Sequence, residues 1–162
     1  MNQTKDLGPC GVLFNSNDLG STLGGVSFRY TEESRPVHED QKGVTEVDGI
    51  KVGASCEVEL SLTRSSLALL SIIIGGSSYT GSVLNVRNEV GKSMYDNAAA
   101  LVLKPIVNGV VSTSVSTWLT IPKAYPKVDL EVAYNNEGQR VYKVMFKGFP
   151  DASSGLIWKI GA

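Results

Sequence analysis

Few side chains in this sequence could carry nucleophilic or metal chemistry. The chain has one histidine, His38, and two cysteines, Cys10 and Cys56, whose spacing fits no zinc-binding pattern. No motif of a serine hydrolase, zinc protease, phosphate-binding loop or dinucleotide-binding fold occurs. We therefore expect no catalytic centre, no metal and no other cofactor. The two thiols are interpreted as buried and free, with a disulfide between them as the alternative.

His38 and two tryptophans are the remaining candidates for ligand binding. His38 lies among charged residues, and we interpret it as a solvated surface side chain rather than a base or a ligand. Trp118 and Trp158 could form a platform for a sugar ring, although aromatic side chains more often pack in a core or an interface. A β-sandwich that binds carbohydrate or a host surface is therefore one alternative function.

The composition predicts one globular domain. The chain has 162 residues, of which 42% are hydrophobic and 19% are charged, so it can bury a core and is too apolar for a disordered protein. The net charge of −1 argues against a free-standing protein that binds the nucleic acid backbone. The longest apolar run, Leu67–Ile74, is too short to span a bilayer, and no signal peptide is visible. We expect a soluble protein, made in a cytoplasm and not inserted into a membrane.

Alternation of apolar and polar residues predicts a mainly β fold, because a strand with one buried face repeats every two residues. Four stretches alternate clearly: Val26–Thr31, Glu57–Leu62, Lys127–Tyr134 and Arg140–Phe149. Shorter strands are expected at Cys10–Phe14, Ala99–Val107, Val115–Ile121 and Leu156–Ile160. Residues 135–139 tolerate positive φ and predict a hairpin between the last two long strands. Pro122 and Pro126 are expected to flank the start of the strand at Lys127.

One segment has the features of a helix. Thr63–Ile74 places leucine and isoleucine on one helical face, Thr63 can cap its first turn, and two glycines follow it. A buried strand over Ala68–Ile74 is the competing interpretation. The next stretch, Gly75–Asn97, is rich in glycine, serine and asparagine, and it predicts either a long functional loop or a locally ordered insertion.

A charged stretch, Thr31–Gly49, lies between two predicted strands and is poor in apolar residues. It is either a solvated loop or an extended arm or hairpin that docks on a neighbouring subunit. Charges of both signs suit contacts between identical copies. The candidate interface residues in and beside this stretch are Arg29, Glu32, Glu33, Arg35, His38, Glu39, Asp40 and Lys42.

The order of these parts resembles the tail tube (major tail) proteins of tailed bacteriophages. Asp18–Val26 is similar to the family's glycine-rich start of a long strand, and a strand at Cys56–Leu62 runs directly into the predicted helix. The other matching stretches are Cys10–Phe14, His38–Gly43, Glu46–Gly49 and Tyr142–Asp151. Glu46 and Val47 stand where the family often has a proline, and the segment from Gly75 to Asn97 matches no part of the pattern.

The resemblance implies a β-sandwich or partial barrel with one flanking helix and an extended arm. In that family six copies form a ring, their strands close into one barrel on oligomerisation, and the rings stack into a tube that delivers DNA. It implies a structural virion protein, located in the tail and assembled in the cytoplasm of a bacterial host. Further partners would be the sheath, baseplate and tail-terminator proteins. Other proteins on this fold, such as the type VI secretion inner tube or a tail-completion protein, are alternatives.

The resemblance also implies a channel, and an acidic or neutral lining would let DNA slide whereas a basic lining would hold its phosphates. The candidates for channel-lining residues are Glu57, Glu59, Asp129 and Glu131. The polar faces that carry them could equally form the outer wall.

Overall fold

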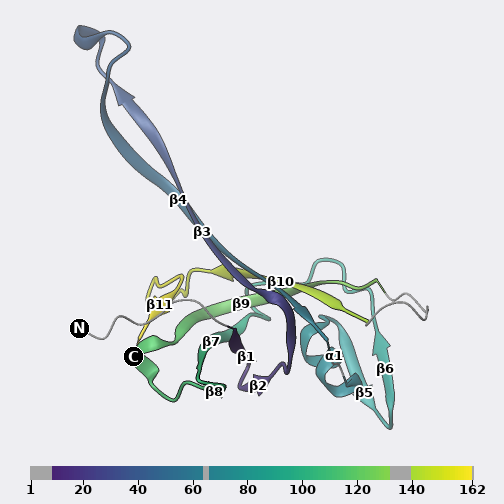
Figure 1. Cartoon of the computed structure of the whole chain (residues 1–162). Helices are drawn as coiled ribbons and strands as arrows, with labels where there is room; N and C mark the ends of the chain where they lie inside the picture. The colour runs from purple at the N-terminus through teal and green to yellow at the C-terminus, as the bar shows by residue number, and fades with distance from the viewer. Residues whose placement is uncertain (1–8, 64–65, 132–139, 162) are drawn as a thin grey trace.

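The computed structural model describes residues 9–63, 66–131 and 140–161, and it confirms a mainly β fold with one helix (Figure 1). A long two-stranded arm projects from a body built on one large antiparallel sheet. The strands are β1 (Cys10–Phe14), β2 (Asn17–Asp18), β3 (Thr22–His38), β4 (Glu46–Leu62), β5 (Ser77–Thr80), β6 (Val83–Val86), β7 (Ala99–Val107), β8 (Val110–Val111), β9 (Leu119–Asp129), β10 (Tyr142–Phe149) and β11 (Lys159–Ile160). The helix is α1 (Leu67–Ile73), and two 3-10 turns lie at Asp40–Lys42 and Val115–Thr117.

The large sheet has the order β2-β1-β7-β9-β10-β4-β3, with β8 paired to β7 and β11 paired to β9. The alternating stretches behave as expected, because Val58, Leu60 and Leu62 of β4 are buried while Glu59 between them is exposed. The rings of Phe14 on β1 and Phe146 on β10 lie 5.0 Å apart, although two strands separate them in the sheet. Three strand spacings of a flat sheet would span about 14 Å. The sheet therefore curls strongly around one core.

The helix is shorter at its start than the expected Thr63–Ile74. Ser66 is the N-cap, and its Oγ accepts a hydrogen bond of 3.1 Å from the backbone N–H of Leu69. Thr63 instead binds the end of β4 to the start of β3, because its N–H and its hydroxyl both donate to the carbonyl of Ser21. The competing strand over residues 68–74 is wrong, since α1 occupies nearly all of that range.

The stretch Gly75–Asn97 is a locally ordered insertion, the second of the two interpretations given above, because it contains the hairpin β5–β6, which packs on α1. One other expectation needs correction. The strand expected to start at Lys127 starts eight residues earlier, so that Pro122 and Pro126 lie inside β9. Prolines are tolerated there because β9 changes partners: its first half pairs with β7 and β11, and its second half pairs with β10.

Two further strand predictions need correction. Residues 115–117, expected to begin a strand, form a 3-10 turn, and the predicted C-terminal strand is reduced to the two residues of β11. The expected turn at 135–139 lies outside the described residues. Over the described ranges, α1 is the one α-helix, and no helix is long and apolar enough to cross a bilayer.

Candidate functional site: the arm and the exposed sheet face

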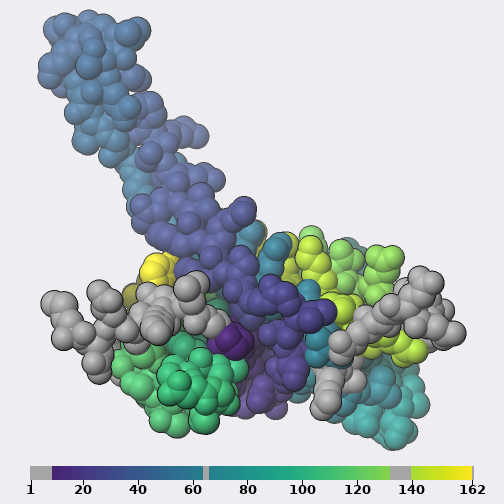
Figure 2. Space-filling model, in the orientation of Figure 1, coloured from purple at the N-terminus to yellow at the C-terminus, as the bar shows by residue number. Residues whose placement is uncertain are grey.

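The arm is the outer part of a hairpin formed by β3 and β4. Each strand has 17 residues, and the pairing runs from Thr22 opposite Leu62 to His38 opposite Glu46. The outer parts of the two strands leave the body and stand clear of it (Figures 1 and 2). The charged stretch is thus a hairpin that prolongs its flanking strands, rather than a loop between them.

Burial along the hairpin changes abruptly where the arm leaves the body. On β3, Phe28 and Tyr30 are half-buried, and their rings pack edge-on against Trp158 at 5.4 and 5.5 Å between centroids. Past Tyr30, every residue of β3 is exposed except Val37, which is half-buried. An isolated two-stranded ribbon is at best marginally stable in water. The outer hairpin therefore lacks the packing that holds the inner hairpin.

A polar cluster marks the base of the arm. The Tyr30 hydroxyl donates to Glu32 at 2.7 Å, and the Lys51 ammonium binds the same carboxylate and also lies 3.1 Å from the Tyr30 oxygen. The hydrogen bond from Lys51, followed by the one from Tyr30, lowers the pKa of Glu32. The same contacts raise the pKa of Lys51. Because both charged groups are exposed, the cluster orients the arm more than it stabilises the fold.

The arm has two unlike faces. Lys51 and Glu32 share the face that continues from Tyr30, so alternation places Ile50 and its cross-strand partner Arg35 on the opposite face. Ile50 is 57% exposed, and Val44 at the tip is 96% exposed. The tip itself is a 3-10 turn in which Lys42 pairs with Glu39 at 3.3 Å. The arm thus presents exposed aliphatic groups between charges of both signs, a composition suited to a protein contact.

The structure brings together seven of the eight candidate interface residues and separates one. Arg29 lies on the exposed face of the body sheet, opposite Glu57. The other seven follow the arm from base to tip: Glu32, Glu33, Arg35, His38, Glu39, Asp40 and Lys42.

The face of β3, β4, β10 and β9 that lies opposite the core carries three of the four candidates for channel lining. Glu57 and Glu59 lie on this face of β4, and the strand register places Asp129 of β9 on the same face. Glu131 is exposed but lies beyond the end of β9. The opposite face of the same strands holds the buried core.

Sequence patterns alone missed the basic side chains that share this face. Lys147 is the direct cross-strand neighbour of Glu57, and Lys143 is that of Asp129. In total the face carries five basic residues (Arg29, Lys123, Lys127, Lys143 and Lys147) and three acidic ones (Glu57, Glu59 and Asp129). Alternation assigned each residue to a face, but only the pairing order shows that opposite charges are neighbours. The face is therefore of mixed charge rather than acidic.

The cysteine and tryptophan side chains considered above as candidate sites are buried or packed against other residues of the fold. Cys56 is buried and Cys10 half-buried; both are free, and burial raises the pKa of each thiol. The Trp118 indole donates to the carbonyl of Ser112 at 2.9 Å, and the Lys104 ammonium lies 3.8 Å from its ring centre. Trp158 packs on the base of the arm, so neither indole forms an open platform. The described residues contain no group of three or more potential metal-binding side chains.

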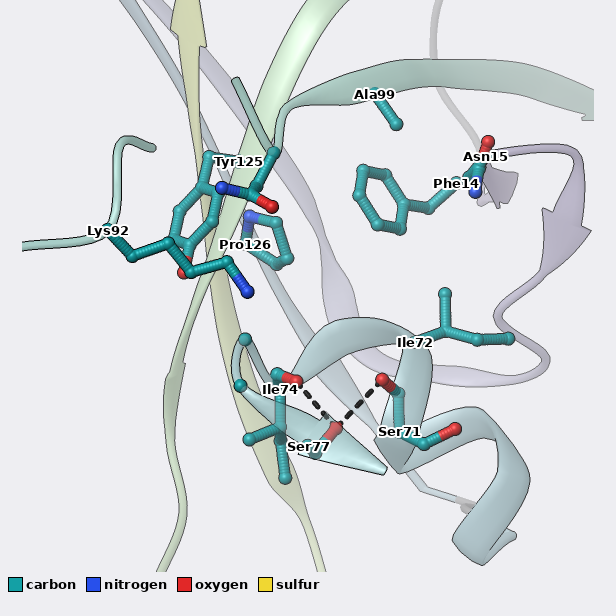
Figure 3. A pocket seen from close by; sticks show the side chains of 13 residues that line it. Phe14, Asn15, Ser71, Ile72, Ile74, Ser77, Lys92, Ala99, Tyr125 and Pro126 are labelled. Carbon is teal, nitrogen blue, oxygen red and sulfur yellow. Dashed lines mark hydrogen bonds between the residues drawn. The ribbon is translucent and has the colours of Figure 1, made fainter. Parts of the chain in front are cut away.

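A hollow of about 200 Å³ lies between the end of α1 and β9 (Figure 3). The Ser77 hydroxyl at its floor is held by the carbonyls of Ser71 and Ile74, at 2.9 and 2.7 Å. Lys92 at its edge forms an ion pair with Glu89. Tyr125 closes one side, so close to Gly75 that a Cβ there would lie 2.2 Å from its hydroxyl. The Ser77 hydroxyl and the Lys92 ammonium are thus committed to structural contacts.

No protein-family model matches the chain, and no curated protein matches its sequence. The fold and the surfaces described above are therefore the basis for inferring its function.

Proposed function

We propose that the chain is a non-enzymatic structural protein that assembles into hexameric rings stacked as a tube, the inner tail tube of a bacteriophage. The observation that carries the proposal is the arm, which exposes Ile50 and Val44 beyond its base and Val52 at its base. Fixing the backbone of one residue costs about 1–2 kcal/mol of conformational entropy, and the burial of side chains must compensate for that cost. In the monomer the outer hairpin buries few side chains. A neighbouring copy of the chain supplies that burial in the proposed assembly.

The large sheet also favours assembly into a closed ring. Among the described strands, β2 forms one edge and β3 the other, and each pairs on one side only. Open edges template further strand pairing, and closure of a sheet between subunits removes them. A repeated head-to-tail contact closes into a ring when its rotation permits. Arms that reach the next ring would then stack these rings into a tube.

The tube is proposed to conduct DNA, with the mixed-charge face toward the channel. On that face the acidic candidates Glu57 and Asp129 lie directly opposite Lys147 and Lys143, so the charge of each of these two lysines is partly neutralised by a neighbour. Such a lining would attract phosphate less than a purely basic one and would let DNA slide. In this setting the protein belongs to the virion tail, and its further partners are sheath, baseplate and tail-terminator proteins.

Electron microscopy of the full chain with light scattering tests the proposal, together with a variant that lacks only the outer arm. Ser34 and Lys51 are cross-strand partners, so replacing residues 35–50 by an Asn-Gly turn closes the hairpin at a natural pair. The full chain should form rings and tubes, and the shortened chain should keep its thermal stability but form no tubes. Normal tubes from the shortened variant would remove the arm from assembly. A full chain that stays monomeric at all concentrations and binds a glycan would favour the carbohydrate-binding alternative.

A second measurement tests which face lines the channel. Glu59→Cys, in a background in which Cys10 and Cys56 are alanine, should react slowly with a bulky maleimide in assembled tubes and rapidly in dissociated subunits. Ala152→Cys is an exposed control on the loop after β10. Equal protection of both positions would contradict the assignment.

A further inference from the structure

Four lysines form a strip on the face of the sheet that lies opposite the core. Lys123 and Lys127 belong to β9, and Lys143 and Lys147 belong to its neighbour β10; we call these four the lysine strip. Residues that pair directly across two strands share a face. The pairs that place all four lysines on one face are Lys123–Phe149, Tyr125–Lys147, Lys127–Met145 and Asp129–Lys143. Lys123 is half-buried and the other three lysines are exposed.

The two strands of the strip concentrate positive charge in a chain that is acidic elsewhere. Apart from the four lysines, the only charged residue of β9 and β10 is Asp129, so the two strands carry a net charge of +3. The whole chain carries −1, so all its other residues together carry −4. The overall net charge, which argued against a protein that binds the nucleic acid backbone, therefore averages over two unlike surfaces.

The lysines of the strip form no ion pairs with other described residues. The ion pairs found in that part of the chain lie elsewhere: Lys42–Glu39, Lys51–Glu32 and Lys92–Glu89. Lys127 faces the apolar Met145 and lies diagonally between Lys143 and Lys147, at the roughly 7–8 Å typical of diagonal neighbours in a sheet. Like charges at this separation repel one another, and a bound polyanion would relieve the repulsion.

The spacing of the strip suits an extended polyanion rather than a single phosphate group. Lysines four residues apart on one strand lie about 14 Å apart, and paired strands lie about 4.8 Å apart. The ammonium groups therefore form a track and do not converge on one point. Duplex DNA carries one negative charge per roughly 1.7 Å of its axis, so a track of this length passes about eight phosphates.

An aromatic pair holds one end of the strip. The rings of Phe149 and Tyr95 pack edge-on with their centres 6.3 Å apart. The Lys123 ammonium lies 5.3 Å from the centre of the Tyr95 ring, and the Lys147 ammonium lies 5.9 Å from that of Phe149. The attraction between an ammonium group and a ring face positions two of the four charges.

We propose that the lysine strip is the part of the protein that contacts the phosphates of DNA. The inference rests on the proposed function, in which this face lines the channel, and it assigns the contact to β9 and β10. Glu57 and Glu59 of the adjoining strand β4 border the strip, and their charges repel phosphate. With at most four contacts per copy, the logarithm of the affinity falls with the logarithm of the salt concentration with a slope no steeper than about −4. Such a contact guides DNA and still lets it slide.

Titration of the unassembled full chain into a short fluorescent DNA duplex, with anisotropy measured at several salt concentrations, tests the strip. Lys127→Gln should weaken binding about tenfold at low salt and reduce the salt slope by about one. Lys159→Gln removes the same charge from an exposed position on β11 and should leave both values nearly unchanged. Glu59→Gln should strengthen binding, because it removes a carboxylate beside the strip. Equal losses in Lys127→Gln and Lys159→Gln would overturn the inference.

Acetylation of the lysines, measured by mass spectrometry, locates the contact directly. DNA should slow the acetylation of Lys127, Lys143 and Lys147 severalfold and leave that of Lys51 and Lys159 unchanged. Polyglutamate at the same concentration of charge should protect the strip less, because the charge density of duplex DNA is far higher. Equal protection by polyglutamate would assign the strip to an acidic protein segment and would overturn the contact with DNA.

Two outcomes separate this inference from the proposed function. If the chain forms normal tubes but the unassembled chain neither binds DNA at low salt nor shows protected lysines, the inference is overturned and the proposed assembly stands. If the chain binds DNA through the strip but forms no tubes at any concentration, the inference is supported and the proposed assembly is overturned.

Discussion

The inner and outer halves of the hairpin β3–β4 share one backbone pairing but differ in nearly everything else. In the inner half, Val58, Leu60 and Leu62 are buried, and the neighbouring strand β10 covers the free edge of β4. In the outer half, Ile50 and Val52 are more than half exposed, and each strand has the other as its only neighbour in the sheet. The pairing of β3 with β4 thus continues from the packed core into an arm that is exposed to solvent.

This difference separates the contribution of strand pairing from that of burial. A backbone hydrogen bond contributes about 0.5–1.5 kcal/mol net, which is similar to the conformational entropy lost by the residues that form it. Full burial of a valine or leucine side chain adds about 1.5–3 kcal/mol. The inner half is stabilised by side chains that are buried within the same chain, whereas the outer half gains such burial when another surface covers it. The predictions below compare the two halves directly.

Truncation of one aliphatic side chain in each half should give the largest contrast. Leu62→Ala removes a fully buried side chain from the inner half and should lower the free energy of unfolding by about 2–5 kcal/mol. Ile50→Ala, in the outer half, should change it by less than about 0.5 kcal/mol. Urea denaturation of the unassembled chain measures both. Equal losses would show that the arm packs on the body in solution.

A methyl group added to a glycine should lower the free energy of unfolding more beside the inner half than in the outer half, with a smaller difference than the truncations give. Gly148 on β10 is the cross-strand partner of Cys56, and a Cβ there would lie 2.1 Å from the Cys56 sulfur. Gly148→Ala should therefore cost about 1–3 kcal/mol through overpacking. Gly49→Ala in the arm meets only the Glu46 carboxylate at 3.4 Å and should be nearly neutral.

A double mutant identifies the cause of that loss. If the clash with sulfur dominates, Cys56→Ala should make the change at Gly148 much less costly, and a thermodynamic cycle from thermal melts measures the coupling. No coupling between the two positions would point to the Ile121 side chain instead, which would lie 3.0 Å from the added Cβ.

Much of the body could be predicted because a strand with one buried face alternates apolar and polar residues along the sequence. The strands Cys10–Phe14 and Ala99–Val107 have the predicted bounds, since polar or turn residues flank each apolar run. The start of β9 could not be predicted in the same way. Its upstream half contains Pro122 and lacks clean alternation, and its place depends on partners distant in the sequence, β7 and β11.

The candidate surfaces could be predicted from the sequence only in part. Alternation placed Glu57 and Glu59 on one face, but their lysine neighbours follow from the order in which β4, β10 and β9 pair. The charged stretch had no apolar period, so composition could not choose between a loop and a hairpin. Pairing supplies the answer, because the arm continues a ladder that begins in the core.

The smallest expected effect is the pH dependence of the arm's base. The pKa of Glu32 is lowered in the folded chain, so its contribution is complete above its usual value near 4.3 and is lost as the pH falls through the lowered value. The pKa of Lys51 is raised, so its contribution is complete below about 10.4 and is lost as the pH rises through the raised value. The cluster should therefore order the arm fully between about pH 4.3 and 10.4 and loosen it progressively outside that window. Amide hydrogen exchange of arm residues in the unassembled chain measures this, since exchange should quicken in acid relative to its intrinsic rate.

Glu32→Gln should remove this acceleration of exchange in acid, the acid limb, whereas Glu33→Gln should keep it because Glu33 lies on the opposite face. High salt should weaken the limb, as expected for an exposed ion pair. An acid limb unchanged in Glu32→Gln would assign it to other carboxylates of the arm.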